Sequence, residues 1–226
     1  MALNTVTDAS DRVLIRNVLL SVSNKDGLEE LVGGVLKHCP GARFYSTGGT
    51  YRAVEALLGE QAEQKLVSVE RYTGQPELQG GLVKTLDYKV HLGLLSEEFN
   101  EDHQRDIERV GAVRFDLVAV NLYPFQEAIA HADATPETAR GNIDIGGPAM
   151  LRAAAKNYLR VAPVCDPALY GELVSELAAH SGATSLAFRY GLAARAFRHT
   201  ADYDAAVAAY FAETEPATAA AAYRVR

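Results

Sequence analysis

The chain has 226 residues, of which 48% are hydrophobic and 23% charged, and a formal net charge of −7. This length suits one large domain or at most two small ones, and the composition is that of an ordinary soluble globular protein. The acidic balance argues against nucleic acid or an anionic membrane as the main partner, and no apolar run approaches the roughly 18 residues that span a bilayer.

Short apolar runs alternate with helical patterns along the chain. The first strand is predicted over residues 18–23, and Asp26 with Glu29 three positions later forms a capping-box pattern for a helix that ends near His38. Further strands are predicted over residues 43–46, 66–69, 115–121 and 161–165, and further helices over 51–58, 148–157 and 184–213, with another starting at Asp166-Pro167. We therefore expect an α/β fold with three layers and a mainly parallel sheet.

The domain is predicted over residues 16–213, with tails at 1–15 and 214–226. The polar first residues lack the basic start and apolar core of a signal peptide. Cys39 and Cys165 are far apart in sequence, which favours buried thiols in a reducing cytoplasm. Neither the cysteines nor the six scattered histidines have the spacing of a metal site, so no metal is expected.

Polar segments follow three of the predicted strands, at residues 21–25, 46–50 and 121–123. Ligands bind at the carboxyl ends of parallel strands, so we expect these segments to meet in one crevice. The turn Ser46-Thr47-Gly48-Gly49-Thr50 joins a strand to a helix, where backbone N–H groups and the helix N-terminus favour a phosphate monoester. A plain tight turn with a helix cap is the alternative.

The segment Ser21-Val22-Ser23-Asn24-Lys25 could complete a phosphate cradle with two hydroxyls and an ammonium, although on its own it is typical of a solvated turn. The chain has neither the Gly-Lys-Ser/Thr ending of a Walker loop nor a Gly-x-Gly-x-x-Gly motif. The phosphate is therefore expected to belong to a mononucleotide or a sugar phosphate.

Residues 141–157 contain the most informative pattern. Pro148 suits the first position of a helix, Asp144 stands in the loop that enters this helix, and Arg152 and Lys156 share one helical face. These charged side chains lie close together in the sequence, and packing of the helix does not require them. The alternative is an Ala-rich core helix with solvated cationic ends.

Two more side chains are candidates for the same site. Lys84 follows the flexible pair Gly80-Gly81, which favours a lysine placed over a ligand, although a surface lysine would have the same pattern. Tyr123 stands at the end of a strand, where it is either a crevice residue or a core aromatic.

Six segments together resemble IMP cyclohydrolase, the N-terminal domain of the bifunctional purine-biosynthesis enzyme that also carries AICAR transformylase. They occur in the same order as in that family, over about residues 17–211, and lie at residues 21–25, 46–50, 83–86, 121–125, 143–147 and 152–157. The family's transformylase region has no counterpart here. The resemblance therefore implies a free-standing cyclohydrolase and a separate AICAR formyltransferase as its pathway partner.

The resemblance implies a methylglyoxal-synthase-like (Rossmann-like) α/β fold, a homodimer, and closure of the formylated aminoimidazole carboxamide ribotide (FAICAR) to IMP with loss of water. It implies no metal or organic cofactor. The catalytic residues that it implies are Lys84, Tyr123, Asp144 and Lys156, with Lys156 beside Asp144. The residues that it implies for the 5′-phosphate are Ser21, Ser23, Lys25, Thr47, Gly48, Gly49, Thr50 and Thr85, and those for the base are Asn121, Ile145 and Gly146.

The sequence departs from the family at two positions. Leu82 stands where the family usually has an arginine, and Asp87-Tyr88 stands where it usually has His-Pro. Both changes are expected to weaken phosphate binding, and Lys89 or Arg71 could compensate. Two alternatives stay open. One is a purine-nucleotide-binding regulatory protein that lost turnover through these two changes, and the other is methylglyoxal synthase, which shares the fold and the phosphate loop by family resemblance.

Overall fold

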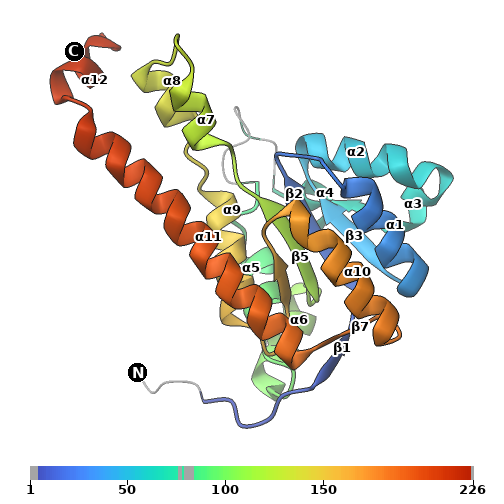
Figure 1. Ribbon diagram of the computed structural model, residues 1–226. Coiled ribbons are helices and arrows are strands. Elements are labelled where there is room, and N and C mark those ends of the chain that lie inside the picture. The colour runs from blue at the N-terminus through green and yellow to red at the C-terminus, as the bar shows by residue number, and fades with distance from the viewer. Residues whose placement is uncertain (1–4, 76–77, 79–83, 225–226) are drawn as a thin grey trace.

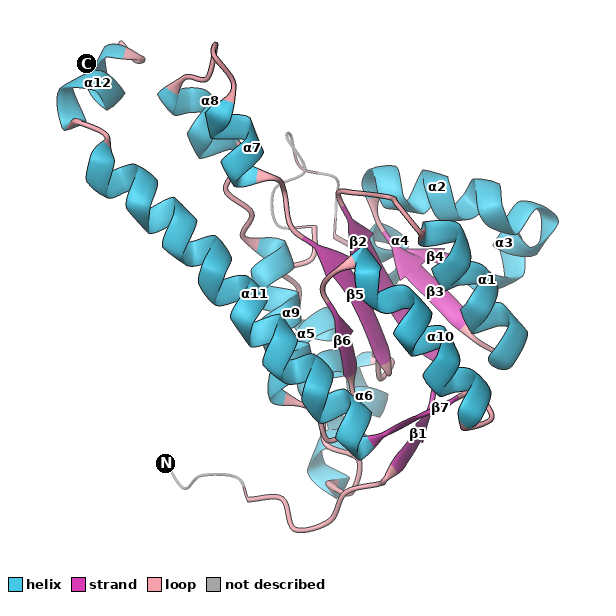
Figure 2. Cartoon of the chain, in the orientation of Figure 1, coloured by secondary structure: helices cyan, strands magenta, loops and turns pink. Residues whose placement is uncertain are grey.

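The computed structural model describes residues 5–75, 78 and 84–224. Its main feature is a five-stranded sheet in which all neighbouring strands are parallel (Figure 2). The strands, in spatial order, are β4 (Leu66–Ser68), β3 (Arg43–Ser46), β2 (Asn17–Val22), β5 (Leu117–Asn121) and β6 (Ala162–Val164). Each of the five strands expected from the sequence is confirmed, with its ends shifted by no more than two residues.

Helices cover both faces of this sheet, which confirms the expected three-layer α/β fold (Figure 1). On one side lie α1 (Leu28–His38), α2 (Gly48–Leu58) and α10 (Tyr170–Ala179), and on the other lie α5 (Tyr88–Leu95), α9 (Gly146–Lys156) and α11 (Leu186–Glu213). The shorter helices are α3 (Ala62–Lys65), α4 (Val69–Thr73), α6 (Glu101–Val110), α7 (Phe125–Ala130), α8 (Pro136–Gly141) and α12 (Pro216–Ala221), with 3-10 helices η1 (Gly59–Gln61) and η3 (Pro167–Leu169). In the described ranges, no helix combines the length and the apolar character that crossing a membrane requires.

The sheet forms the centre of the hydrophobic core. Leu19 of β2, Phe44 of β3 and Val118 of β5 have no exposed surface. A parallel sheet covered on both faces buries successive residues of each strand, which explains why the strands appear in the sequence as short apolar runs. Their carboxyl ends meet at one edge, and the loops at this edge carry most of the candidate residues.

The first expected tail, residues 1–15, includes a strand that sequence reasoning missed. Strand β1 (Arg12–Leu14) pairs antiparallel with β7 (Ala183–Ser185). The guanidinium of Arg189, which is fully buried, donates to the C=O of Ser10 at 2.7 Å and to that of Leu159 at 3.0 Å. These contacts tie the N-terminal segment to helix α11. Part of the second expected tail forms the exposed helix α12.

The capping box predicted for the first helix is wrong. The N-cap of α1 is Gly27, whose φ of 69° lies in the left-handed region, and no side chain caps this helix. The side chain of Asp26 instead accepts a hydrogen bond from Asn24 at 3.0 Å. A glycine adopts this backbone conformation without steric cost, so the local turn rather than an acidic cap starts the helix.

A buried ion pair lies next to the amino end of β5, at the opposite edge of the sheet from the candidate residues. Arg160 is 3.3 Å from Asp116, and its other donors bond to the C=O of Gly93 and of Phe115 at 2.6 and 2.8 Å. Burial raises the pKa of Asp116 and lowers that of Arg160 to about 10. These charges hold loops together on the side away from the site.

Candidate functional site

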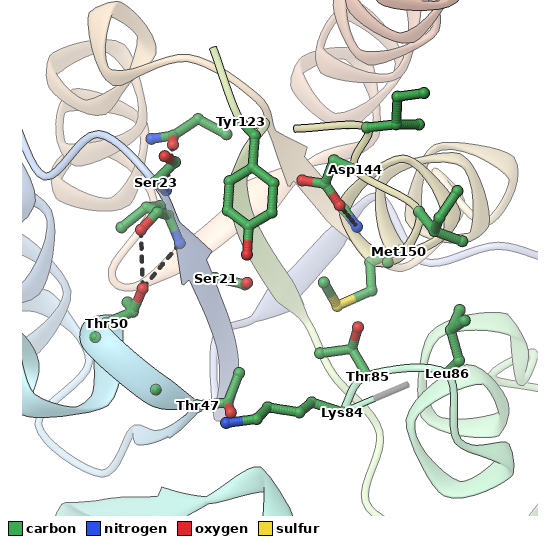
Figure 3. Close-up of a pocket in the computed structure, with 18 of the residues that line it drawn as sticks. Ser21, Ser23, Thr47, Thr50, Lys84, Thr85, Leu86, Tyr123, Asp144 and Met150 are labelled. Carbon is green, nitrogen blue, oxygen red and sulfur yellow. Dashed lines mark hydrogen bonds between the residues drawn. The ribbon is translucent and has the colours of Figure 1, made fainter. Parts of the chain in front are cut away.

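One cavity of about 600 Å³ lies at the carboxyl ends of the parallel strands (Figure 3). It brings together 14 of the candidate residues named from the sequence: Ser21, Ser23, Lys25, Thr47, Gly48, Gly49, Thr50, Lys84, Thr85, Asn121, Tyr123, Asp144, Ile145 and Gly146. Six further residues line it, namely Val22, Leu86, Gly141, Ile143, Gly147 and Met150. All six are apolar residues or glycines that lie within the sequence segments named above, and their side chains offer no polar group.

One end of the pocket is built by the end of β2 and the start of α2. The hydroxyl of Thr50 donates to the C=O of Val22 at 2.9 Å and accepts from its N–H at 3.1 Å, which fixes α2 against the strand. Lys25 donates to the C=O groups of Val22 and Ser23 at 3.2 and 3.1 Å, and a Cβ at Gly49 would lie 3.8 Å from its ammonium. The free N–H groups of a helix N-terminus beside an ammonium form a site suited to an anion.

An acidic residue that the sequence reasoning missed stands beside this anion site. Glu70 of α4 accepts a hydrogen bond from the Thr47 hydroxyl, and the same carboxylate oxygen lies 3.7 Å from the ammonium of Lys84. In Figure 3 the Lys84 ammonium points towards Thr47. Glu70 therefore links the start of α2 to Lys84 across the pocket wall. Glu70 directly follows the strand expected at residues 66–69, and no pattern in the sequence distinguishes it.

The other end of the pocket holds Asp144, at the entrance of α9. Its carboxylate accepts a hydrogen bond from the N–H of Gly147 at 2.8 Å. Burial raises the pKa of Asp144 above its usual value, while the backbone N–H groups of Gly147 and Tyr123 act in the opposite direction. A half-buried carboxyl group with a raised pKa, facing a cavity, is suited to accepting a proton.

Apolar side chains form the rim of the pocket near Asp144. Tyr123 is 51% exposed and Ile145 is 63% exposed. Exposed apolar surface beside a cavity is available to contact a bound ligand. Figure 3 shows the Tyr123 ring between Ser21 and Asp144, so its hydroxyl lies within the pocket rather than in the core.

Steric contacts explain why glycines stand at both positions before Pro148. A Cβ at Gly147 would lie 2.6 Å from the Asp144 carboxylate and 2.7 Å from the Leu122 side chain, and one at Gly146 would lie 2.5 Å from the Thr85 hydroxyl. No real Cβ has contacts this short. The two glycines therefore let Asp144 and Thr85 approach the helix start closely.

Replacement of Gly147 by alanine is expected to destabilise the protein by about 1–3 kcal/mol, because Asp144 or Leu122 must move. Thermal or denaturant unfolding measures this change. The matched control is Gly33→Ala in α1, where a Cβ would meet nothing within 4 Å. Gly33→Ala should be neutral or stabilising. Equal stability of both variants would contradict the steric reason given for Gly147.

The Asn121 side chain lines the pocket and is also bonded to the loop after β2. Its oxygen accepts from the N–H groups of Ser23 and Asn24 at 2.6 and 2.9 Å, and its NH₂ donates to the C=O of Asn24 at 2.7 Å. Asn121 therefore holds the loop after β2 in place.

Lys156 is the one expected site residue outside the pocket, and its expected position beside Asp144 is corrected. It is exposed at the last residue of α9, an 11-residue helix that begins two residues after Asp144. An α-helix rises about 1.5 Å per residue, so the two ends of α9 are about 15 Å apart. Arg152, on the same face, stacks over the ring of Phe197 at 5.5 Å. Within one chain, the two bases are thus separate from the carboxylate.

The structure describes only one of the two positions at which the sequence departs from the family pattern. Leu82 lies outside the described residues. Asp87 is 6% exposed, and its carboxylate caps α5 by accepting from the N–H of Lys89 at 2.7 Å and from Gln75 at 2.9 Å. Asp87 does not line the pocket, and neither do Lys89 and Arg71, the expected compensating bases. The carboxylate of Asp87 therefore caps α5 and is not part of the pocket.

In the described part of the chain, no group of three or more His, Cys, Asp or Glu residues is arranged to hold a metal ion. Cys39 and Cys165 are both buried free thiols, and burial raises the pKa of each to about 11. Neither is therefore present as a reactive thiolate near neutral pH. The chemistry that this pocket can perform relies on its lysines, its carboxylate, its hydroxyls and its backbone N–H groups.

The pocket joins a helix N-terminus and an ammonium at one end to a half-buried carboxylate at the other, an arrangement suited to a small anionic molecule. Comparison with known proteins shows the family to which the chain belongs. A family model described as the AICARFT/IMPCHase bienzyme matches residues 154–225. The bifunctional purine biosynthesis protein PurH of Brucella ovis is 45% identical over 205 residues, and that of Rhizobium etli is 44% identical. Each alignment covers 91% of this chain and 37% of the relative.

A solved structure is also similar. The crystal structure of ForH superposes with a TM-score of 0.73 at 36% identity, covering 87% of this chain and 99% of that one. The chain belongs to the AICARFT/IMPCHase family. It spans 37% of the length of the curated PurH relatives that it matches.

Proposed function

We propose that this protein is an IMP cyclohydrolase, which closes FAICAR to IMP with loss of water in purine biosynthesis. The observation that carries the proposal is the arrangement of one pocket, with a site suited to an anion at one end and a half-buried carboxylate with a raised pKa at the other. A nucleoside monophosphate matches this arrangement, because its phosphate and its base lie at opposite ends of the molecule. Kinship with bifunctional PurH proteins supports the purine assignment.

The phosphate would lie at the start of α2. The N–H groups of Gly48, Gly49 and Thr50 and the ammonium of Lys25 would bind its oxygens, with the hydroxyls of Ser21 and Ser23 beside them. Since the whole chain is acidic, this attraction must be local rather than an effect of net charge.

The reaction is an intramolecular attack of the carboxamide nitrogen on the neighbouring formyl carbon. Both groups are attached to one ring, so the substrate itself supplies much of the proximity, and the pocket selects the reactive rotamer. Asp144 would take a proton from the nitrogen as the C–N bond forms. The ammonium of Lys84 and the hydroxyl of Tyr123 would stabilise the formyl oxygen as it gains negative charge. This oxygen takes up two protons and leaves as water as its C–O bond breaks. The two protons are balanced by the one that Asp144 takes from the carboxamide nitrogen and by the one that the formamide nitrogen loses when the ring C=N bond forms.

Glu70 is expected to orient Lys84 for this role. Replacement by glutamine keeps an acceptor for Thr47 but removes the charge that attracts the ammonium. We expect kcat to fall about tenfold, as for a change of roughly 1.4 kcal/mol in the barrier, without weaker binding of IMP. Steady-state kinetics and IMP titration measure the two quantities. The control is Glu55→Gln, an exposed residue of α2; equal kcat in both variants would refute this role of Glu70.

The proposal extends to the expected cellular context. A homodimer is supported by exposed aromatic side chains along α11, where Tyr190, Phe197 and Phe211 are 61%, 40% and 62% exposed. The substrate would come from a formyl transfer to the aminoimidazole carboxamide ribotide, performed by an AICAR formyltransferase in the cytoplasm. Sedimentation of the purified protein tests the dimer.

The decisive experiment mixes purified protein with FAICAR and follows IMP above the spontaneous background. Turnover supports the cyclohydrolase. Tight binding of IMP without turnover would instead favour a purine-nucleotide-binding regulatory protein. Formation of methylglyoxal from a triose phosphate would favour methylglyoxal synthase. This alternative is the weaker one because the relatives are purine-biosynthesis proteins.

A further inference from the structure

One tyrosine of helix α11 contacts the loop that carries Asp144. The hydroxyl of Tyr203 accepts a hydrogen bond from the backbone N–H of Asp144, with 2.7 Å between the atoms. It donates a second hydrogen bond to the C=O of Asn142 at 3.0 Å. A phenol has one proton to donate, so its donor role is fully used here. The loop between α8 and α9 is thus held at two backbone positions by a single side chain that is distant in the sequence.

The same side chain contacts the segment that carries Tyr123. The ring of Tyr203 packs edge to face against Phe125, with 6.2 Å between ring centroids. Phe125 is 1% exposed and follows Tyr123 by two residues, so its position constrains that of Tyr123. Tyr203 therefore lies between the two segments that bring the proposed proton acceptor and the proposed oxygen ligand to the pocket. It is not one of the described residues that line this pocket.

We propose that Tyr203 is a positioning residue for the cyclisation, whose hydroxyl sets the place of the Asp144 carboxylate relative to the substrate. The proposal rests on the function proposed above. Its physical reason is that a carboxylate in a loop acts efficiently only when the backbone of this loop is held still, and small misplacements of reacting groups are costly. The anion site at the start of α2 has no contact with Tyr203, so substrate binding and the chemical step are expected to respond differently.

The test compares Tyr203→Phe with Tyr210→Phe. Both variants remove one hydroxyl from α11 and keep a ring next to Phe125, because the Tyr210 ring lies 5.8 Å from that of Phe125. Two quantities are measured. Hydrogen exchange at the Asp144 amide reports the loop without reference to activity, and steady-state kinetics with FAICAR give kcat and KM separately.

We expect faster exchange at Asp144 in Tyr203→Phe, and a kcat lower by between about tenfold and 100-fold, with KM nearly unchanged. Tyr210→Phe should match the wild type in both measurements. An active wild type with an unchanged kcat in Tyr203→Phe would overturn the positioning role alone, as would a loss confined to KM. A wild type without turnover would overturn the proposed function and this role with it, whatever the exchange rates show.

Discussion

Replacement of Asp144 by asparagine should lower the kcat for cyclisation by about 10²–10⁴-fold, the range expected when a general base is lost. Asparagine has nearly the same shape, and its amide oxygen can still accept the hydrogen bond that Gly147 donates to Asp144. The variant therefore keeps the start of α9 intact while it loses the group that takes a proton. Stopped assays with FAICAR measure the change, and thermal unfolding checks that stability is retained.

The pH dependence gives a second test of the same residue. Burial raises the pKa of Asp144, and the proposed mechanism needs its ionised form. Activity should therefore be present above this raised pKa and should fall as the pH drops through it. The acid limb of kcat should lie at a higher pH than an exposed aspartate would produce. Wild-type activity in Asp144→Asn, or no acid limb attributable to this residue, would remove Asp144 from the mechanism.

Replacement of Lys84 by alanine is the second change with a large expected effect. Removal of one preformed donor to a developing oxyanion usually costs about 2.7–4 kcal/mol, or roughly 10²–10³ in kcat. The side chain of Lys84 is only 19% exposed and lies 3.7 Å from Glu70, so its ammonium is held at the pocket and not free in solvent. Steady-state kinetics on the purified variant measure the loss.

Two further variants make this result specific. Lys89→Ala removes a lysine that lies 6.0 Å from the Tyr72 ring, outside the pocket, and should leave kcat unchanged. Lys84→Ala combined with Glu70→Gln tests whether the carboxylate left behind repels the substrate. If the double variant recovers wild-type activity, Lys84 serves only to neutralise Glu70, and its role at the formyl oxygen is refuted.

Much of the fold could be predicted because its signals are local. A strand of a covered parallel sheet buries successive residues, so residues 18–23 and 115–121 stand out as mainly apolar runs. The pocket could be predicted for a related reason. The carboxyl ends of parallel strands lie at one edge of the sheet, so polar segments that follow different strands, such as 21–25 and 46–50, must come together there. The resemblance to a known family then supplied the roles expected of the residues, including that of Lys84.

The chain alone thus determined the alternation of strands and helices, the layer architecture and 14 of the residues that line the pocket. Only the tertiary structure showed that Glu70 and Tyr203 support the pocket from outside, that Lys156 lies at the far end of its helix, and that Arg12–Leu14 forms a strand. The reason is physical. Periodicity and turn chemistry report interactions between near neighbours in the chain, whereas these four features depend on which distant segments pack against one another and on the length of a rigid helix.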